Sequence, residues 1–457
     1  MREERPVIIV GGGIAGIAAA LHLAEHGRRV TLLETRTKLG GRATSFVDVR
    51  TGEAVDNCQH LAMGCCTNYL DLCRRLGVLD QIEWTHHTTW IEPGGRTSVL
   101  SRSLMPAPGH FGPSFLGVRF LDASEKVSLA ACLGAALRED RRRHKGITLR
   151  EWLLRHDQSP RVIDRFWSPV IVSACNLTVD RVCAATALHV FQEGFFAHRD
   201  AASIGVSRVP LARLYDRAEA TIAAAGGEVR LSSGVERVWA DRVLTTSGRT
   251  LEAESVVLAV PPERAARLIA PELAGVDPRF AAAGRITHSP ILGVHLIFDR
   301  PVLTHPHAVL VDRPTQWLFR KDERGTKIHA VISAADDWVP LNESEITRRV
   351  VEDLHACIPA SRAARVIASR PVKEKLATFA PTPEVERVRP GVTGASGVFL
   401  AGDWVSTGWP ATMEGAARSG AMAAAAVLGL PERSLLRPPL QAALLARALA
   451  TAPLHAD

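Results

Sequence analysis

The order of apolar and polar residues predicts alternating strands and helices at the start of the chain. Pro6 to Val10 is a short run rich in Val and Ile, typical of a buried parallel strand. An Ala- and Leu-rich helix is expected over Ile17 to Glu25, ending at Gly27. A second strand follows over Arg29 to Leu33. This order favours the α/β class, with a Rossmann-like domain at the N-terminus.

Three glycines join the first strand to the helix in the spacing G-x-G-x-x-G. Gly11 permits a tight turn, Gly13 lets the backbone approach a pyrophosphate, and Gly16 lets the helix pack closely on the strand. Ile14 and Ala15 lie between these glycines, and the helix N-terminus supplies N–H groups and a positive dipole end for phosphate. The pattern predicts a dinucleotide site.

The acid at the end of the second strand indicates which dinucleotides the site can bind. A carboxylate at Glu34 can accept hydrogen bonds from both ribose hydroxyls, and it would repel the 2′-phosphate of NADP. Gly40, Gly41 and Arg42 follow shortly afterwards and can add N–H donors and a cation beside the pyrophosphate.

A second strand–helix joint lies near the C-terminus. Residues 397 to 401 read as a strand, and an Ala-rich helix is expected to end near Leu428. The carboxyl end of a parallel strand is the usual place for a ligand, and a helix N-terminus stabilises an anion. The cofactor-binding residues expected here are Gly402, Asp403, Thr412 and Met413.

The remaining pattern divides the 457 residues into interleaved parts. We expect a discontinuous dinucleotide-binding domain over residues 1–85, 205–270 and 371–432. An α+β substrate domain is expected over 86–204 and 271–370. The tail over 433–457 has leucines at helical spacing, so it either packs on the body or contacts a membrane surface.

Composition narrows the possible partners. The net charge of +7 fits an anionic ligand or surface, but no aromatic-interleaved basic repeat indicates nucleic acid. The eight cysteines include no C-x-x-C pair, so no metal site is expected. With neither a leader pattern nor eighteen consecutive apolar residues, a cytoplasmic location is expected, with peripheral contact at the inner face of the membrane left open.

Glu34 followed by Gly40-Gly41-Arg42 resembles the flavin amine oxidase and phytoene desaturase superfamily. The resemblance implies FAD as the cofactor. It also implies that Asp403 binds the ribityl chain, that Thr412, Met413 and Glu414 face the pyrimidine edge of the flavin, and that the backbone of Val235 contacts adenine. Thr412 replaces the Tyr that amine oxidases usually carry, which disfavours an aromatic amine cage.

Further segments resemble the hydroxysqualene dehydroxylases of hopanoid biosynthesis. The segments are Asp56-Asn57-Cys58-Gln59-His60, Met63-Gly64-Cys65-Cys66-Thr67-Asn68 and Ala377-Thr378-Phe379. This resemblance implies that reduced FAD replaces the allylic hydroxyl of hydroxysqualene, a long apolar isoprenoid, by hydride. Hydroxide leaves poorly, so an acid is needed; His60 is the first candidate, with Asp56 and Glu414 as alternatives.

Two other hypotheses stay open. A desaturase of a carotenoid or squalene-like chain would use the same motifs in the opposite redox direction. A non-catalytic isoprenoid-binding protein could share the fold. For an enzyme, the absence of a second strand–glycine–helix unit implies an external electron donor.

Overall fold

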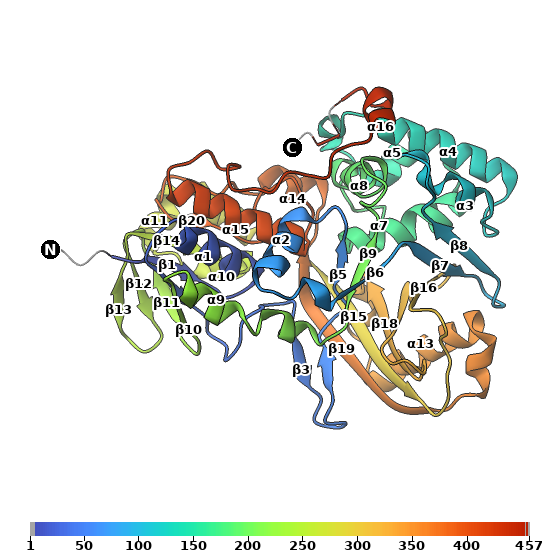
Figure 1. Ribbon diagram of the computed structural model, residues 1–457, viewed down its shortest axis with the longest axis horizontal. Helices are drawn as coiled ribbons and strands as arrows, with labels where there is room; N and C mark the ends of the chain where they lie inside the picture. Colours follow the sequence, from blue (N-terminus) through green and yellow to red (C-terminus); the bar gives the residue numbers. More distant parts are fainter. Residues whose placement is uncertain (1–4, 453, 456–457) are drawn as a thin grey trace.

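The computed structural model describes residues 5–452, 454 and 455. The chain forms two interleaved parts that lie side by side (Figure 1). One is built on a five-stranded parallel sheet and the other on a seven-stranded mixed sheet. No helix in the described part of the chain is long and apolar enough to cross a bilayer.

The five-stranded sheet takes its strands from three distant parts of the chain. Its order is β10 (Glu228–Arg230), β2 (Val30–Leu33), β1 (Val7–Val10), β14 (Ser255–Leu258) and β20 (Phe399–Leu400). β1 lies between β2 and β14 and is fully buried, which explains its unbroken apolar sequence.

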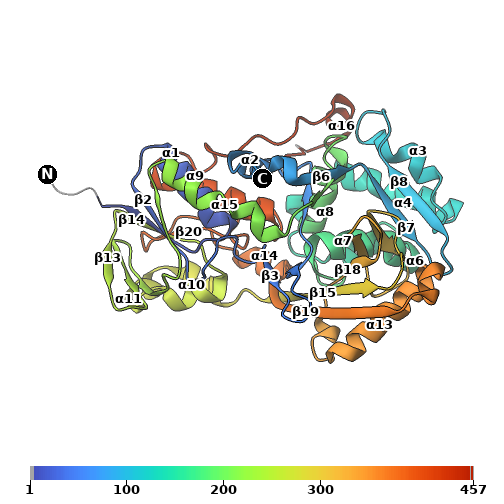
Figure 2. The same ribbon diagram turned by 60° about the horizontal axis from the view of Figure 1, so that its bottom comes forward.

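Two helices pack on each other over one face of this sheet, α1 (Ile14–Glu25) and α15 (Met413–Val427) (Figure 2). Small residues permit the close approach, because a Cβ added at Gly420 would collide with the carbonyl oxygen of Ala15. α1 begins three residues earlier than predicted, and Gly27 ends it in the left-handed conformation with φ +75°. β20 covers only two residues of the predicted five.

The seven-stranded sheet forms the second part. Its order is β19 (Val366–Phe379), β15 (His288–Phe298), β18 (Lys327–Ser333), β17 (Trp317–Arg320), β16 (His307–Leu310), β7 (His87–Ile91) and β8 (Thr97–Ser101). Helices pack beside this sheet: α3 (Gly112–Leu116), α4 (Ala123–Arg138), α5 (Leu149–Arg155), α6 (Pro160–Val162), α7 (Ser168–Cys175), α8 (Ala184–Phe191) and α13 (Glu343–Cys357). The π-helical segment η5 (Gln192–Phe196) continues α8.

Smaller elements complete the two parts. The remaining strands are β3 (Ser45–Val47), β4 (Ala54–Asp56), β5 (Leu61–Met63), β6 (Ile82–Thr85), β9 (Ile204–Ser207), β11 (Val235–Val238), β12 (Arg242–Thr245) and β13 (Thr250–Glu252). The remaining α-helices are α2 (Thr67–Arg75), α9 (Ala218–Ala224), α10 (Pro262–Leu268), α11 (Pro271–Val276), α12 (Pro278–Gly284), α14 (Pro383–Val388) and α16 (Leu444–Leu449).

The structure corrects two of the predicted domain boundaries. Residues 371–379, assigned to the dinucleotide domain, belong to β19 of the seven-stranded sheet. Residues 271–286, assigned to the substrate domain, pack on the dinucleotide domain, where Phe280 is buried and Arg279 donates to the carbonyl oxygen of Val398. The predicted boundary at residue 371 falls inside the continuous strand β19, and the one at residue 271 falls where α11 begins. Neither position is marked by a change in the pattern of apolar and polar residues.

The C-terminal tail packs on the body of the protein. The Arg437 amide donates to Oδ1 of Asn68 in α2 at 2.8 Å, and the Ala443 amide donates to the carbonyl oxygen of Ala197 at 2.8 Å. Ala446 and Leu454 are buried against the helices of the substrate part. The tail therefore bridges both parts of the molecule.

Candidate active site

A large cavity lies between the two parts of the molecule. Its volume is about 1210 Å³, above the ~300–1,000 Å³ typical of small-molecule pockets. It reaches from the glycine turn after β1 to apolar side chains of α4 and η5, such as Leu133 and Phe195. The cavity therefore has room for a dinucleotide and for a second, elongated molecule.

The glycine turn forms one end of this cavity. Gly11 has φ +109°, and an added Cβ would collide with the carbonyl oxygen of Ala259. Gly16 does not line the cavity; a Cβ there would strike the carbonyl oxygen of Gly11, so it is needed for packing. Gly13 is different, because its nearest neighbour would be the Cα of Gly41 at 3.8 Å.

The two predicted glycine segments lie side by side. The Gly40 amide donates to the carbonyl oxygen of Gly12 at 2.9 Å, and Gly41 has φ +61°. Together with Gly13 they leave a floor of bare backbone at the cavity end where α1 begins with Ile14 and Ala15. Bare backbone at a helix N-terminus fits the pyrophosphate of FAD.

Glu34 is fixed at the end of β2. Its carboxylate accepts hydrogen bonds from the amides of Gly12 at 2.7 Å and Arg36 at 2.8 Å. The side chain lines the cavity, and each oxygen keeps a lone pair for a ribose hydroxyl. Val235, at the start of β11, lines the same end of the cavity. These positions fit the ribose and adenine of FAD.

Arg42 and Asp403 form an ion pair in the cavity wall. Arg42 also donates to the carbonyl oxygen of Ala377 at 2.9 Å. Gly402 precedes Asp403 with φ +145°, and its amide donates to the Ser419 hydroxyl at 2.8 Å. The pair brings the N-terminal and C-terminal motifs together.

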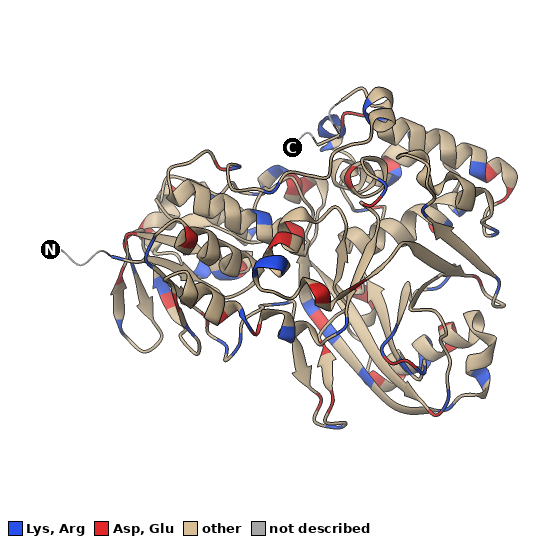
Figure 3. Ribbon diagram, in the orientation of Figure 1, with Lys and Arg blue, Asp and Glu red and all other residues tan. Residues whose placement is uncertain are grey.

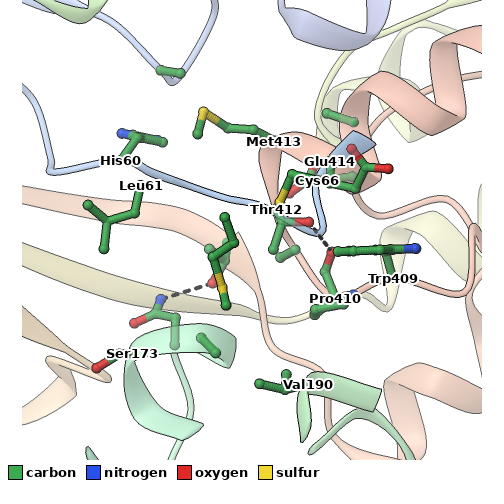
Figure 4. Close-up of a pocket in the computed structure, with 18 of the residues that line it drawn as sticks. His60, Leu61, Cys66, Ser173, Val190, Trp409, Pro410, Thr412, Met413 and Glu414 are labelled. Carbon is green, nitrogen blue, oxygen red and sulfur yellow. Dashed lines mark hydrogen bonds between the residues drawn. The ribbon is translucent and has the colours of Figure 1, made fainter. Parts of the chain in front are cut away.

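The N-terminus of α15 faces the same cavity. Thr412 is the N-cap residue, and its hydroxyl accepts a hydrogen bond from the Gly415 amide at 3.0 Å. Thr412 and Met413 line the cavity (Figure 4). The positive end of the helix dipole therefore lies where a reduced, anionic flavin would be stabilised.

Glu414 lines the cavity, but its carboxylate is already bound by groups of the protein. Its carboxylate is fully buried and accepts hydrogen bonds from the amides of Asn68 at 2.9 Å and Tyr69 at 2.8 Å. It also accepts from the Asn68 side chain at 2.8 Å. Burial raises the pKa of Glu414, and these hydrogen bonds oppose the shift. The carboxylate joins α15 to the N-terminus of α2, and these hydrogen bonds argue against its acting as the proton donor.

Asp56, the other alternative acid, does not line the cavity, which corrects its place in the predicted site. One carboxylate oxygen accepts from the Ser45 hydroxyl at 2.7 Å and the Leu211 amide at 3.0 Å, and the other lies 3.3 Å from Nζ of Lys321. These partners hold the Asp56 carboxylate outside the cavity, whereas His60, which follows the end of β4, lines it.

His60 keeps its place among the candidates. Nδ1 lies 3.2 Å from the carbonyl oxygen of Cys58, which assigns the hydrogen of the neutral ring to Nδ1. Nε2 is without a hydrogen-bond partner among the residues that the structure describes. Burial lowers the pKa of His60, and the contacts with Cys58 and Asp56 only partly oppose this. The neutral ring therefore predominates at neutral pH.

Several cavity residues were missed by the sequence analysis. Asn176, at the end of α7, has φ +51° and donates to the Thr378 hydroxyl at 2.9 Å. Its Oδ1 accepts from the Ala334 amide at 2.7 Å, so it ties α7 to the seven-stranded sheet. Val190 lines the same chamber, beside Trp409, which was expected from the sequence to shape the cavity. The only sequence signal for Asn176 was an asparagine at the end of a helix, and that signal does not show which residues its side chain binds.

The fold and site define an FAD-dependent oxidoreductase. The chain belongs to the family described as flavin containing amine oxidoreductase, whose model matches residues 14–428. The protein uses FAD as its cofactor. Membership of an enzyme family and the glycine floor together exclude the hypothesis of a non-catalytic binding protein.

Two groups of curated relatives resemble this chain. It is 29% identical to a hydroxysqualene dehydroxylase of Sinorhizobium fredii, over 92% of this chain and 97% of that protein. The corresponding enzyme of Rhodopseudomonas palustris is 28% identical, over 93% and 99%. A 15-cis-phytoene desaturase of an Oncidium hybrid is 26% identical, over 94% of this chain but 79% of that protein.

Solved structures confirm the fold. Putrescine oxidase bound to putrescine superposes with a TM-score of 0.71 at 17% identity, covering 93% of this chain and 99% of that one. Cyclohexylamine oxidase from Brevibacterium oxydans gives 0.66 at 20% identity, with the same coverage. The two tyrosines of the present chain, Tyr69 and Tyr215, are buried and do not line the cavity.

Proposed function

We propose that this enzyme converts hydroxysqualene to squalene and water. The carbon–oxygen bond of the allylic alcohol breaks, its oxygen leaves as water with a proton from the protein, and the carbon receives a hydride, the two-electron chemistry that reduced FAD supplies when bound. An external electron donor returns the two electrons. The proposal places the reaction in the cytoplasm, at a membrane surface that holds the substrate.

The cavity carries this proposal. Its wall beyond the glycine floor is formed largely by apolar side chains of α4, α7, α8 and η5, which suits a long hydrocarbon chain. The Asn176 side chain donates to the Thr378 hydroxyl in this wall, which leaves these two groups less available to hold water. A dry wall protects a reactive allylic cation from capture by water.

His60 supplies the proton in this proposal. Departure of hydroxide needs an acid, and His60 is a titratable residue of the chamber whose Nε2 is free to bind the hydroxyl group. The neutral ring accepts a hydrogen bond from the hydroxyl, and the protonated ring donates its proton to the leaving oxygen. Because burial lowers the pKa of His60, the reactive form increases as the pH falls.

Desaturation of a carotenoid or squalene-like chain is the second candidate, favoured by the likeness to phytoene desaturases. The dehydroxylases are matched over nearly their whole length at higher identity, which supports the first candidate. Mixing oxidised enzyme with squalene or phytoene under anaerobic conditions tests the choice. Bleaching of the flavin by either hydrocarbon would favour desaturation, whereas an unchanged flavin spectrum is expected.

A further inference from the structure

The outer end of the cavity opens among exposed apolar side chains. Phe111, Phe115 and Leu449 line the cavity there and come from the ends of η2 (Gly109–Phe111), α3 and α16. These elements lie together with α4 and β8 at one end of the substrate part in both views (Figures 1 and 2). The exposed apolar residues on these elements and on the loop before η2 are Val99, Leu104, Met105, Leu116, Val127, Leu444, Leu445 and Leu449.

A short loop before η2 presents two of these residues to solvent. The Ser103 amide donates to the carbonyl oxygen of His110 at 2.7 Å and closes the base of the loop. Leu104, at the tip, is 88% exposed, and Met105 is 48% exposed. Because this hydrogen bond closes the loop and Leu104 points to solvent beside the cavity, the loop is suited to insert among the acyl chains of a membrane.

Basic side chains gather at the base of this loop. We name them the rim cluster: His86, Arg102, His110, His198 and Arg199. They come from three segments that meet there: the Arg102 amide donates to the carbonyl oxygen of His86 at 3.1 Å, and the Arg102 side chain pairs with Asp200, which follows Arg199. Figure 3 shows that elsewhere Lys and Arg are interspersed with Asp and Glu over both parts.

The rim cluster faces one carboxylate, that of Asp200, which also lies 3.9 Å from Nδ1 of His198. Asp200 forms an ion pair with Arg102 and lies 3.8 Å from Nε of Arg199; in the described chain these arginines pair with no other carboxylate. His110 is fully buried, and neither ring nitrogen has a hydrogen-bond partner among the described residues. Burial, followed by the charges of His198, Arg102 and Arg199, lowers the pKa of His110 to about 4.

We propose that the rim cluster binds the phosphate of anionic phospholipids while Leu104 and Met105 insert among the acyl chains, which seats the cavity mouth on a membrane surface. The two guanidinium groups carry more charge than the one carboxylate that faces them, which leaves net positive charge for a phosphate. The exposed leucine between Arg102 and His110 favours a lipid headgroup over free phosphate. The purpose of this membrane contact rests on the proposed function, because a water-insoluble substrate would enter the cavity directly from the membrane.

Vesicle binding of the FAD-loaded enzyme tests this inference without turnover. Sedimentation should show binding to phosphatidylcholine vesicles containing phosphatidylglycerol and little to phosphatidylcholine alone. Arg102→Gln with Arg199→Gln should weaken binding about 10- to 30-fold, from about 1 kcal/mol per basic residue near an anionic surface. Leu104→Ser with Met105→Ser, which leaves the rim cluster intact, should weaken it about tenfold or more.

Matched controls keep the result interpretable. Arg249→Gln with Arg324→Gln removes two exposed charges elsewhere, and Val49→Ser with Val276→Ser removes two exposed apolar side chains elsewhere. Both controls should bind vesicles like the wild type, with the same FAD content. Equal losses in test and control variants would overturn the proposal. So would stabilisation by inorganic phosphate without vesicle binding, which would indicate a free-phosphate site. A dehydroxylase failure with intact vesicle binding would refute only the proposed function.

Discussion

Arg42 and Asp403 form an ion pair although 361 positions separate them in the chain. Arg42 follows the second glycine segment, and Asp403 follows β20. Asp403 is buried, so its charge needs the guanidinium for compensation. The pair therefore holds the two halves of the cofactor site in register.

Loss of this pair should weaken FAD binding. Arg42→Ala leaves the buried Asp403 carboxylate unpaired, and hydrogen bonds to charged groups contribute roughly 1.5–3 kcal/mol, so the dissociation constant of FAD should rise about 10- to 100-fold. Fluorescence titration of the apoprotein measures it. Arg28→Ala, which breaks the exposed pair with Glu254, is the control. Equal FAD affinity in wild type and Arg42→Ala would refute the role.

The glycines of the first turn should separate cofactor binding from folding. In Gly13→Ala the new Cβ enters the open floor, so FAD binding should fall at least tenfold while the apoprotein keeps its stability. In Gly11→Ala the positive φ and the collision with Ala259 should destabilise the apoprotein by about 1–3 kcal/mol or more. Urea unfolding and FAD titration distinguish them; equal stability losses would be contrary to this assignment.

Glu414 should prove structural. Glu414→Ala leaves the amides of Asn68 and Tyr69 without their acceptor, which should lower the free energy of unfolding by about 2–3 kcal/mol or more. Glu323→Ala, at an exposed loop position, should change it little. If Glu414→Ala instead abolished turnover with normal FAD content and unchanged unfolding, Glu414 would be the acid after all.

His60 should control the pH dependence of turnover. Because its pKa is lowered in the folded protein, the protonated acid is scarce at neutral pH and kcat/KM should rise as the pH falls. His60→Gln should lower kcat about 10²- to 10⁴-fold and flatten the pH profile. Asp56→Asn is the comparison: it should keep the pH dependence and shift it to lower pH, because the charge of Asp56 raises the pKa of His60. An unchanged pH profile in His60→Gln would assign the proton to another group.

The sequence predicted the parts of the site that depend on local order. The glycine turn and the acid at a strand end depend on residues close together in the sequence and lie where the pattern indicated, and the helix between them begins three residues earlier than predicted. Arg42 was expected beside the pyrophosphate; its pairing with Asp403 was not predicted, because that contact joins distant segments.

The failures have the same origin. Asp56 and Glu414 are acids near the flavin motifs, but the carboxylate of Asp56 is bound by the Ser45 hydroxyl and that of Glu414 by amides at the start of α2. Asn176 reaches the chamber only because β15, β19 and α7 meet there. The direction of a side chain and its contacts with distant segments depend on how the whole chain packs. The local sequence around a residue does not show this packing.

Anaerobic single turnover tests the central claim most directly. The enzyme is reduced with one equivalent of dithionite and mixed with hydroxysqualene, and the flavin spectrum and extracted products are followed together. The account predicts that squalene forms in a one-to-one ratio with oxidised FAD and that the rate increases at lower pH. A flavin that stays reduced while hydroxysqualene is recovered unchanged would contradict it.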